Sequence, residues 1–272
     1  MLVRHRRKGI GARTSDIGDV GGGGRNLILH LDANAPNALL AASDAVIEAD
    51  ATAIKTWKDI SGNGRDFTQA TSGHRPVSNI DVLKNMAVLF DGSDDAMHAS
   101  EFYTYVDSTV FIVFKASNAT GTETLFSDRG GNANEQLFIR ISGDKLRSLA
   151  KDDGGATIGE VVPGSGTGVD SGVAGLVKLS GSAGTPTLSV SGNGAAFTDG
   201  TNGSYNNDTA FGGSQEAPTI GARNSAGTAA EADFFAGDIL EIGIWPRVLT
   251  VAEMNKLLKI ASQKYGLTVS TL

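Results

Sequence analysis

The stretch STVFIVFKAS, residues 108–117, constrains the fold more than any other part of the sequence. It is dense in β-branched and aromatic residues, which are enriched in strands. A short continuous apolar run of this kind is typical of a strand that is buried on both faces. We therefore predict that residues 108–117 form a central strand of a sheet.

Further short apolar runs recur along the chain, and turn residues separate them. Gly is abundant, at 36 of 272 residues, and Gly-rich turns between short apolar runs are typical of all-β proteins. Gly143-Asp144 lies between two alternating runs and predicts a hairpin over 136–150. We expect other strands at 26–33, just before Trp57, at 86–97, at 123–130, as a pair within 175–193, at 218–223 and within 234–249.

Only the C-terminal segment TVAEMNKLLKIASQKYG is convincingly helical. Thr250 and Glu253 have the spacing of a capping box, and Gly266 is a natural helix stop. Met254, Leu257, Leu258, Ala261 and Tyr265 recur at helical spacing, which predicts one apolar face that packs against a sheet.

These elements predict an all-β fold, namely a two-sheet antiparallel jelly-roll sandwich with one C-terminal amphipathic helix. A sandwich of about 250 residues is common as a single domain. We assign residues 26–272 to this domain. Residues 1–25 lack periodicity and include GGGG at 21–24, so we expect an extended N-terminal arm.

Composition excludes several classes of function. The chain has no Cys, so disulfides, zinc–thiolate sites and cysteine nucleophiles are ruled out. No apolar run approaches the roughly 18 residues of a membrane span. A polar stretch follows the basic start, so we expect no signal peptide.

The arm carries an unusual charge for this protein. The whole chain has a formal charge of -7, and five basic residues in the first thirteen leave -12 on the remainder. No aromatic residue lies among residues 1–25 to stack on bases, and an acidic body repels nucleic acid. We therefore interpret the arm as an assembly arm that pairs with carboxylates of a partner subunit, through Arg4, Arg6, Arg7, Lys8 and Arg13. A disordered tail is the simpler alternative.

Four motifs resemble those of concanavalin A-like lectin/glucanase domains, and most of all the laminin-G/pentraxin-like branch. They are WKDISGNGRDF, VLFDGSDDAM, TIGAR and the C-terminal stretch that begins FFAGDILEIGIWPRVL, and they occur in the order seen in that family. The resemblance covers residues 26–272. It implies the fold, but the same fold hosts lectins, glycosidases, adhesion modules and virion components.

Jelly rolls of this branch are frequent in bacteriophage particles, and an N-terminal docking extension would suit such a protein. By this analogy we expect a non-enzymatic virion structural protein, for example a head decoration, fibre or tail-associated protein. Its arm would bind other virion proteins within a homo-oligomer or larger assembly, and its jelly roll would stabilise the particle or bind host glycans. The alternative is a secreted or cell-surface carbohydrate-binding module, and a third reading is a glycosidase.

A glycosidase usually needs two carboxylates on either side of the scissile bond. Glu231, Asp233, Asp238 and Glu241 come nearest to the carboxylate pattern of the glucanase relatives. Asp238 and Glu241 are three residues apart and would point to opposite faces of a regular strand. The sequence therefore disfavours an enzyme.

Two binding sites are weaker candidates. Asp91, Asp94 and Asp95 could supply oxygen ligands to Ca²⁺, although their spacing is not that of an EF-hand loop. The alternative is a solvated strand end in which Gly92 makes the turn. We favour this alternative and expect the protein to bind no cofactor.

Glycan recognition could use loop residues, since lectin sites combine aromatic and polar side chains. Trp57 and Trp245 lie in apolar runs and are expected in the core, and aromatic residues make up only 6% of the chain. None of the four His residues has a context that indicates a role. The candidate glycan-binding residues are Tyr103, Tyr105, Tyr205 and Asn206.

Overall fold

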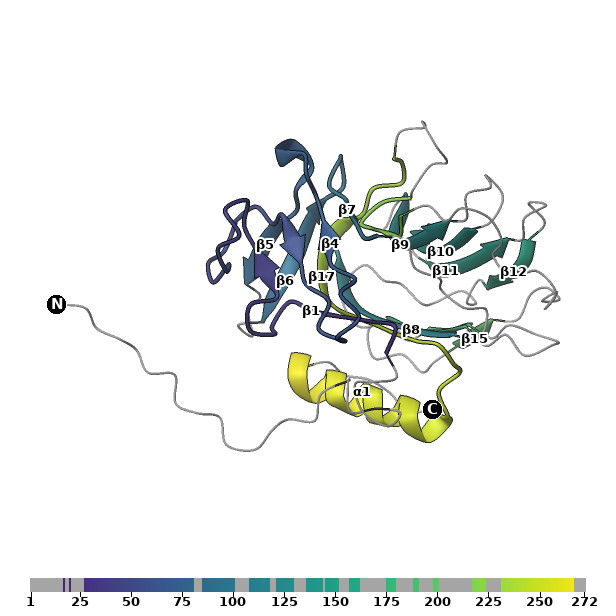
Figure 1. The fold of residues 1–272 in the computed structure, drawn as a ribbon. Coiled ribbons are helices and arrows are strands. Elements are labelled where there is room, and N and C mark those ends of the chain that lie inside the picture. Colours follow the sequence, from purple (N-terminus) through teal and green to yellow (C-terminus); the bar gives the residue numbers. More distant parts are fainter. Residues whose placement is uncertain are drawn as a thin grey trace.

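The computed structural model forms a β-sandwich with one helix (Figure 1). It describes residues 17, 20, 27–80, 85–100, 108–117, 121–129, 136–143, 145–151, 157–161, 175–179, 188–190, 198–200, 217–223 and 231–266. Two antiparallel sheets and a C-terminal helix account for most of the described residues. The predicted all-β sandwich is therefore confirmed.

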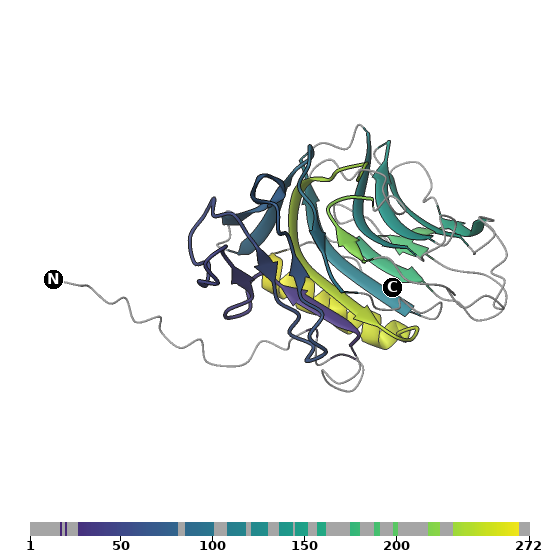
Figure 2. The same ribbon diagram turned by 45° about the horizontal axis from the view of Figure 1, so that its top comes forward.

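The first sheet has six strands, and β8 lies in its interior as predicted. Its order is β13 (Gly175–Leu179), β8 (Ser108–Ala116), β17 (Ala236–Trp245), β6 (Met86–Asp91) and β5 (Val77–Ile80), and β1 (Leu29–Asp32) also pairs with β17. Figure 2 shows β1, in purple, beside the long β17, in yellow-green.

The second sheet has nine strands, several of them only two residues long. Its order is β12 (Thr157–Val161), β11 (Lys145–Lys151), β10 (Gln136–Ser142), β9 (Thr122–Arg129), β16 (Thr219–Ile220), β7 (Met97–His98), β4 (Phe67–Thr68), β3 (Thr56–Trp57) and β2 (Leu39–Leu40). A separate pair consists of β14 (Leu188–Val190) and β15 (Thr198–Gly200), and a short 3-10 helix, η3, spans Ser72–His74.

Two apolar cores lie on the two faces of the six-stranded sheet. Val110, Ile112 and Phe114 of β8 belong to the core between the sheets, whereas Phe111 and Val113 belong to the core beneath the helix. Because side chains alternate along a strand, β8 is buried on both faces, as its apolar run predicts. Both Trp57 and Trp245 are fully buried, as expected.

The helix α1 (Val251–Tyr265) lies along the face of the six-stranded sheet that is turned away from the nine-stranded sheet (Figure 1). The predicted capping box is present between Thr250 and Glu253, and Gly266 ends the helix in the left-handed conformation. Arg247, which precedes the helix, forms an ion pair with the capping residue Glu253, and its Nη2 lies 2.6 Å from Glu253 Oε1. No helix in the described part of the chain is long and apolar enough to cross a membrane.

Two residues of the segment that we assigned to the arm contribute to the helix-side core. Ile17 and Val20 are fully buried there. Trp245 Nε1 donates a hydrogen bond of 3.4 Å to Val20 O. A Cβ on Gly243 would lie 2.9 Å from Ile17 Cδ1, so a larger residue at position 243 would displace the Ile17 side chain. The body therefore holds the chain at residues 17 and 20.

Two hairpin predictions had different outcomes. β10 and β11 form the predicted hairpin, in which Gly143 adopts a positive φ of 55°. The predicted pairing within 175–193 is wrong, because β13 pairs with β8 and β14 pairs with β15. Pairing with β13 satisfies the backbone groups on that edge of β8, which would otherwise be open.

The motif DISGNGRD serves the fold by fastening a loop to the start of β1. Asp59 Oδ1 accepts hydrogen bonds from His30 N and Ser61 N, and Asp59 Oδ2 accepts one from Arg65 N. Asn63 Nδ2 donates to the carbonyls of residues 27 and 28. The turn chemistry expected here is present, since Gly62 and Gly64 have φ of 92° and 72°.

Candidate functional site

The acidic turn after β6 brings the three predicted calcium ligands together. Asp91, Asp94 and Asp95 each offer a carboxylate oxygen, and these oxygens lie within 4.8 Å of one another. Asp91 Oδ1 accepts hydrogen bonds from Ser93 N at 2.8 Å and Asp94 N at 3.3 Å. Gly92 has a φ of 79° and makes the turn. The backbone of the turn thus already uses the Asp91 carboxylate.

Asp95 is the buried member of this turn, with 7% of its surface exposed. Its Oδ2 accepts a hydrogen bond from Asp91 N at 3.0 Å. Burial and the nearby charge of Asp91 raise the pKa of Asp95 to about 6. The charged form of this carboxyl therefore opposes folding at neutral pH.

The four carboxylates nearest to a glycosidase pattern do not converge on one place. Glu231 pairs with His98, and Asp233 lies beside Arg223. Asp238 Oδ1 accepts a hydrogen bond from Asn79 Nδ2 on β5. Glu241 is fully buried beneath the helix. Each carboxylate thus has an internal partner of its own.

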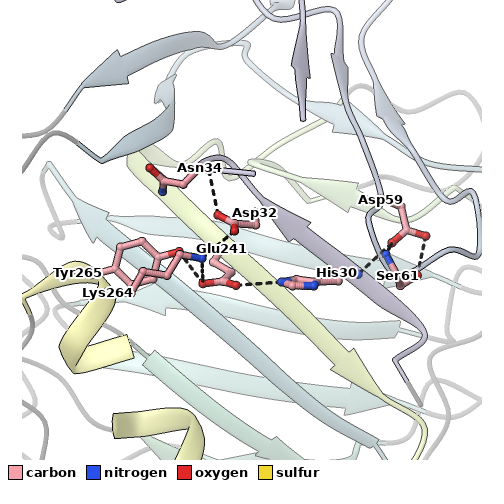
Figure 3. A network of polar contacts seen from close by, with 8 residues as sticks. All are labelled: His30, Asp32, Asn34, Asp59, Ser61, Glu241, Lys264 and Tyr265. Atoms are coloured by element: carbon pink, nitrogen blue, oxygen red, sulfur yellow. Dashed lines mark hydrogen bonds and ion pairs between the residues drawn. The ribbon is translucent and has the colours of Figure 1, made fainter. Parts of the chain in front are cut away.

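Glu241 is the centre of a buried polar network between β1, β17 and α1 (Figure 3). His30 Nε2 lies 2.9 Å from Glu241 Oε1, and Lys264 Nζ lies 3.0 Å from Glu241 Oε2. The Tyr265 hydroxyl donates a further hydrogen bond to Oε2. Lys264 Nζ also lies 2.7 Å from Asp32 Oδ2, so one ammonium joins two carboxylates.

The charges of this network depend on one another. Burial alone would raise the pKa of Glu241, but the hydrogen bond from His30 and the charge of Lys264 outweigh it and lower the pKa. Burial and the charge of Glu241 raise the pKa of Asp32. Burial opposes the charge of Lys264, whereas Glu241 and Asp32 raise its pKa above the usual value.

The network also meets the distance requirement for a metal site, but the ammonium of Lys264 takes the place that a metal ion would occupy. Ligand atoms of His30, Asp32 and Glu241 lie within 4.8 Å of one another. The ammonium of Lys264 contacts both carboxylates and supplies the positive charge that they need. The arrangement therefore fastens the end of α1 to the sheet. All its members but Lys264 are at least nine-tenths buried, which keeps a ligand away from them.

A row of side chains crosses the outer face of the nine-stranded sheet. The inward residues Phe67, Met97, Ile220, Phe126 and Ile139 belong to the core between the sheets. Side chains alternate along each strand, so the neighbouring residues face outwards. Direct cross-strand pairing joins them into one line, the outer-face row, which runs Thr68, His98, Thr219, Ser127, Phe138.

The outer-face row is accessible at one end and covered at the other. Thr68 is exposed, and the His98 side chain is 32% exposed. Thr219, Ser127 and Phe138 are buried. His98 Nε2 lies 2.7 Å from Glu231 Oε1, and His98 Nδ1 lies 3.1 Å from Thr219 Oγ1. The accessible end therefore presents a hydroxyl, an imidazole and a carboxylate side by side.

The segment Glu231-Ala-Asp233 carries two carboxylates, of which Glu231 reaches His98 on this face. Ala232 forms a β-bridge with Arg223, and Thr124 N of β9 donates to Asp233 O at 2.7 Å. Arg223 Nε lies 2.8 Å from Asp233 Oδ2, but its N–H is not aligned for a hydrogen bond. Asp233 has a positive φ of 54°, which costs a non-glycine residue of the order of 1 kcal/mol. The strained residue therefore lies beside two ion pairs, His98–Glu231 and Arg223–Asp233.

Several predicted site residues lie outside the described residues. They are the arm residues Arg4, Arg6, Arg7, Lys8 and Arg13, and the glycan-binding candidates Tyr103, Tyr105, Tyr205 and Asn206. Sequence reasoning gave no role to His98 or His30. The alternation of Phe67-Thr68 and Met97-His98 would have placed Thr68 and His98 on one outer face, but two-residue strands are too short to show a period.

Comparisons with known proteins agree with the fold. No protein-family model matches the sequence, and no curated protein is similar to it. Domain 4 of AbnA, an extracellular arabinanase of family GH43 from Geobacillus stearothermophilus in complex with arabinotriose, is similar in structure with a TM-score of 0.56 and 15% identity. The match covers 87% of this chain and 98% of that domain.

The binding domain of Botulinum Neurotoxin DC in complex with SialylT has a TM-score of 0.55 and 14% identity, over 89% of this chain and 52% of that one. The NanB sialidase of Streptococcus pneumoniae matches with a TM-score of 0.47 and 18% identity, over 62% of this chain and only 26% of the sialidase. The chain thus spans about half of the toxin domain and a quarter of the sialidase. At identities of 14–15%, the likeness to AbnA Domain 4 and to the toxin binding domain shows a shared fold.

Proposed function

We propose that this chain is a non-catalytic carbohydrate-binding module that binds sugars at the accessible end of the outer-face row. The His98–Glu231 pair, at the accessible end of the outer-face row, carries the proposal. One oxygen of Glu231 accepts from His98, and a carboxylate has about four acceptor positions in all. Glu231 can therefore also accept hydrogen bonds from sugar hydroxyls.

The neighbours of Glu231 suit the same task. Thr68 presents a hydroxyl, which both donates and accepts, and Asp233 is a second carboxylate two residues away. His98 and Arg223 balance the two negative charges. A face of this kind favours ligands that are rich in hydroxyl groups over strongly charged macromolecules.

The comparisons support a binding module over the other readings. AbnA Domain 4 and the toxin binding domain, which share this fold, are described in complex with arabinotriose and SialylT. Some matches come from glycosidase chains, as in the NanB sialidase. Nothing in the comparisons supports the expected bacteriophage virion protein, so the carbohydrate-binding alternative is now the better reading.

A glycan array of neutral and acidic oligosaccharides, probed with the whole protein, tests this function. We expect binding to a defined group of glycans, and titration calorimetry with the best ligand should give a dissociation constant. Glu231→Gln, which keeps the shape and removes the charge, should weaken binding about tenfold, the loss of one charged hydrogen bond.

Lys55→Gln is the matched control, because it breaks the exposed Lys55–Asp44 ion pair, which is not part of the outer-face row. It should leave the affinity unchanged. The proposal is overturned if the folded protein binds no glycan on the array, or if Glu231→Gln binds as tightly as the unmodified protein.

A further inference from the structure

The line of outward side chains continues past the accessible end of the outer-face row, from Thr68 across β3 and β2. Leu39, Trp57 and Phe67 belong to the core between the sheets, so the residues that alternate with them face outwards. Cross-strand pairing places these outward residues in line with the row, and a β-bridge adds Val46. The order away from the row is Thr68, Thr56, Leu40, Val46.

The far end of this line is apolar and reaches solvent. Val46 is 42% exposed, and its bridge partner Leu40 is half-buried. Ile47 belongs to the core, and Ile47 N donates to Leu39 O at 2.9 Å, so the preceding Val46 is held with its side chain outwards. We call Leu40 and Val46 the apolar end.

The position of Val46 distinguishes it from the other exposed aliphatic side chains. Three large hydrophobic residues are exposed in the described part of the chain, and the other two, Ile60 and Val251, lie in a loop and at the start of α1. Single exposed aliphatic residues are common on protein surfaces. Val46, in contrast, lies in line with the accessible end of the outer-face row, so one line has a polar end and an apolar end.

The two ends suit the two chemical faces of a sugar chain. Sugars present hydroxyl groups at their edges and C–H groups on their ring faces, and ligand sites likewise combine apolar surface with a few polar groups. Four strand-to-strand steps separate His98 from Val46, which is roughly 19 Å at the usual strand spacing. A single sugar ring cannot span this distance, whereas an oligosaccharide can. It would pass over Thr56, a short side chain that is only 8% exposed.

We propose that the sugar site extends over the apolar end and that its ligand is an oligosaccharide that runs across the strands. Hydroxyl groups at one end of the ligand bind at His98 and Glu231, and a ring face or methyl group at the other end packs on Leu40 and Val46. The inference rests on the proposed function, because its polar end is the site proposed there. A monosaccharide reaches only that polar end and should bind more weakly.

The test measures how affinity depends on the length of the sugar chain. Arabino-, xylo- and cello-oligosaccharides of one to five sugars are titrated by calorimetry, together with each glycan that binds on the array and its fragments, shortened from either end. We expect the affinity of at least one series to rise about tenfold once the chain is long enough to reach the apolar end.

Val46→Thr keeps the branched shape and strand preference of the side chain and replaces one methyl group by a hydroxyl. It should weaken the longer ligands about fourfold, and the double variant with Leu40→Thr about tenfold, whereas sugars too short to reach the apolar end should bind unchanged. Val251→Thr makes the same change at an exposed residue of α1. It is the matched control and should keep the length dependence.

Equal affinity for short and long sugars, or a length dependence that the double variant keeps, overturns the apolar end and leaves the proposed function standing. Failure of every glycan to bind overturns both. A second copy of the chain could instead cover Leu40 and Val46, so sedimentation is measured without glycan. We expect the same oligomeric state for the unmodified protein and the double variant, and a dimer that the double variant dissociates overturns the proposal. Equal melting temperatures for Val46→Thr and the unmodified protein show that a lost affinity is not a loss of folding.

Discussion

Lys264 Nζ, in the last turn of α1, lies 3.0 Å from Oε2 of the fully buried Glu241 in β17. The same ammonium lies 2.7 Å from Asp32 Oδ2 in β1. A single lysine therefore links the helix to two neighbouring strands of the six-stranded sheet. The stability of the helix-side face should depend on this one side chain.

Lys264→Met should destabilise the fold by about 3–5 kcal/mol, because it leaves two buried carboxylates without their cation. The loss should shrink as the pH falls, since protonation removes the repulsion between Asp32 and Glu241. Urea unfolding at several pH values measures both effects. Lys259→Met, an exposed position on the same helix, is the control and should change stability little. If Lys264→Met lowers the free energy of unfolding as little as Lys259→Met does, the network does not stabilise the fold.

Removal of residues 2–13 should leave stability unchanged, whereas removal of residues 2–24 should lower it. The longer truncation deletes Ile17 and Val20, which are fully buried beneath the helix. Each buried aliphatic side chain contributes about 1.5–3 kcal/mol, so we expect a loss of about 3–5 kcal/mol. Thermal unfolding of the two truncated proteins compares them directly. Equal melting temperatures would show that residues 17–20 do not support the core.

Asp95→Asn should stabilise the protein at pH 7.5. The pKa of Asp95 in the folded state is about 6, above its unfolded value of 3.8, so protonation favours folding. Stability should therefore rise in the unmodified protein as the pH falls from about 7 to 4, through this group. The variant lacks this dependence. We expect it to be more stable by on the order of 2 kcal/mol at pH 7.5, and by nearly nothing at pH 4.

The same turn gives a prediction about calcium. Its backbone N–H groups already bind Asp91 and Asp95, so we expect neither EDTA nor millimolar Ca²⁺ to shift the melting temperature. A rise with Ca²⁺ that Asp95→Asn abolishes would instead establish a cation site at these three aspartates.

Glu253→Gln should weaken the helix start in a pH-dependent way. The hydrogen bonds from Arg247 lower the pKa of Glu253 to about 2 in the folded state, below the usual 4.5. Its stabilisation is thus present above about pH 4.5 and is lost as the pH falls towards 2. We expect a cost of about 1 kcal/mol at pH 7, measured by urea unfolding. A cost that persists at pH 2.5 would argue against a role for the charge.

The sequence alone predicts the elements whose residue pattern extends over many positions. The apolar run of β8 and the cap and spacing of α1 identify a central strand and the terminal helix. Pairing over long distances is different: nothing local shows that Gly175–Leu179 joins β8 and not the strand that follows it. The turn residues at 61–64 are likewise visible in the sequence, but their bonds to the chain before β1 are not.

The candidate site could not be assembled from the sequence. His98 and Thr219 are 121 residues apart, and their strands have only two residues each. A charged residue inside a strand, such as Glu241, reads as a solvent-facing position until the helix that covers it is known. The Asp91, Asp94 and Asp95 cluster was predicted because its members are adjacent in the chain.

The pairing of β8 with β17 has a consequence for the synthesis of this protein. On the ribosome, β8 is complete more than a hundred residues before its partner, which begins at residue 236. Until then this strongly apolar strand has an open edge, which is prone to join other chains. A product that terminates before residue 236 should therefore aggregate. Only synthesis of β17 covers this edge of β8 and allows the six-stranded sheet to form.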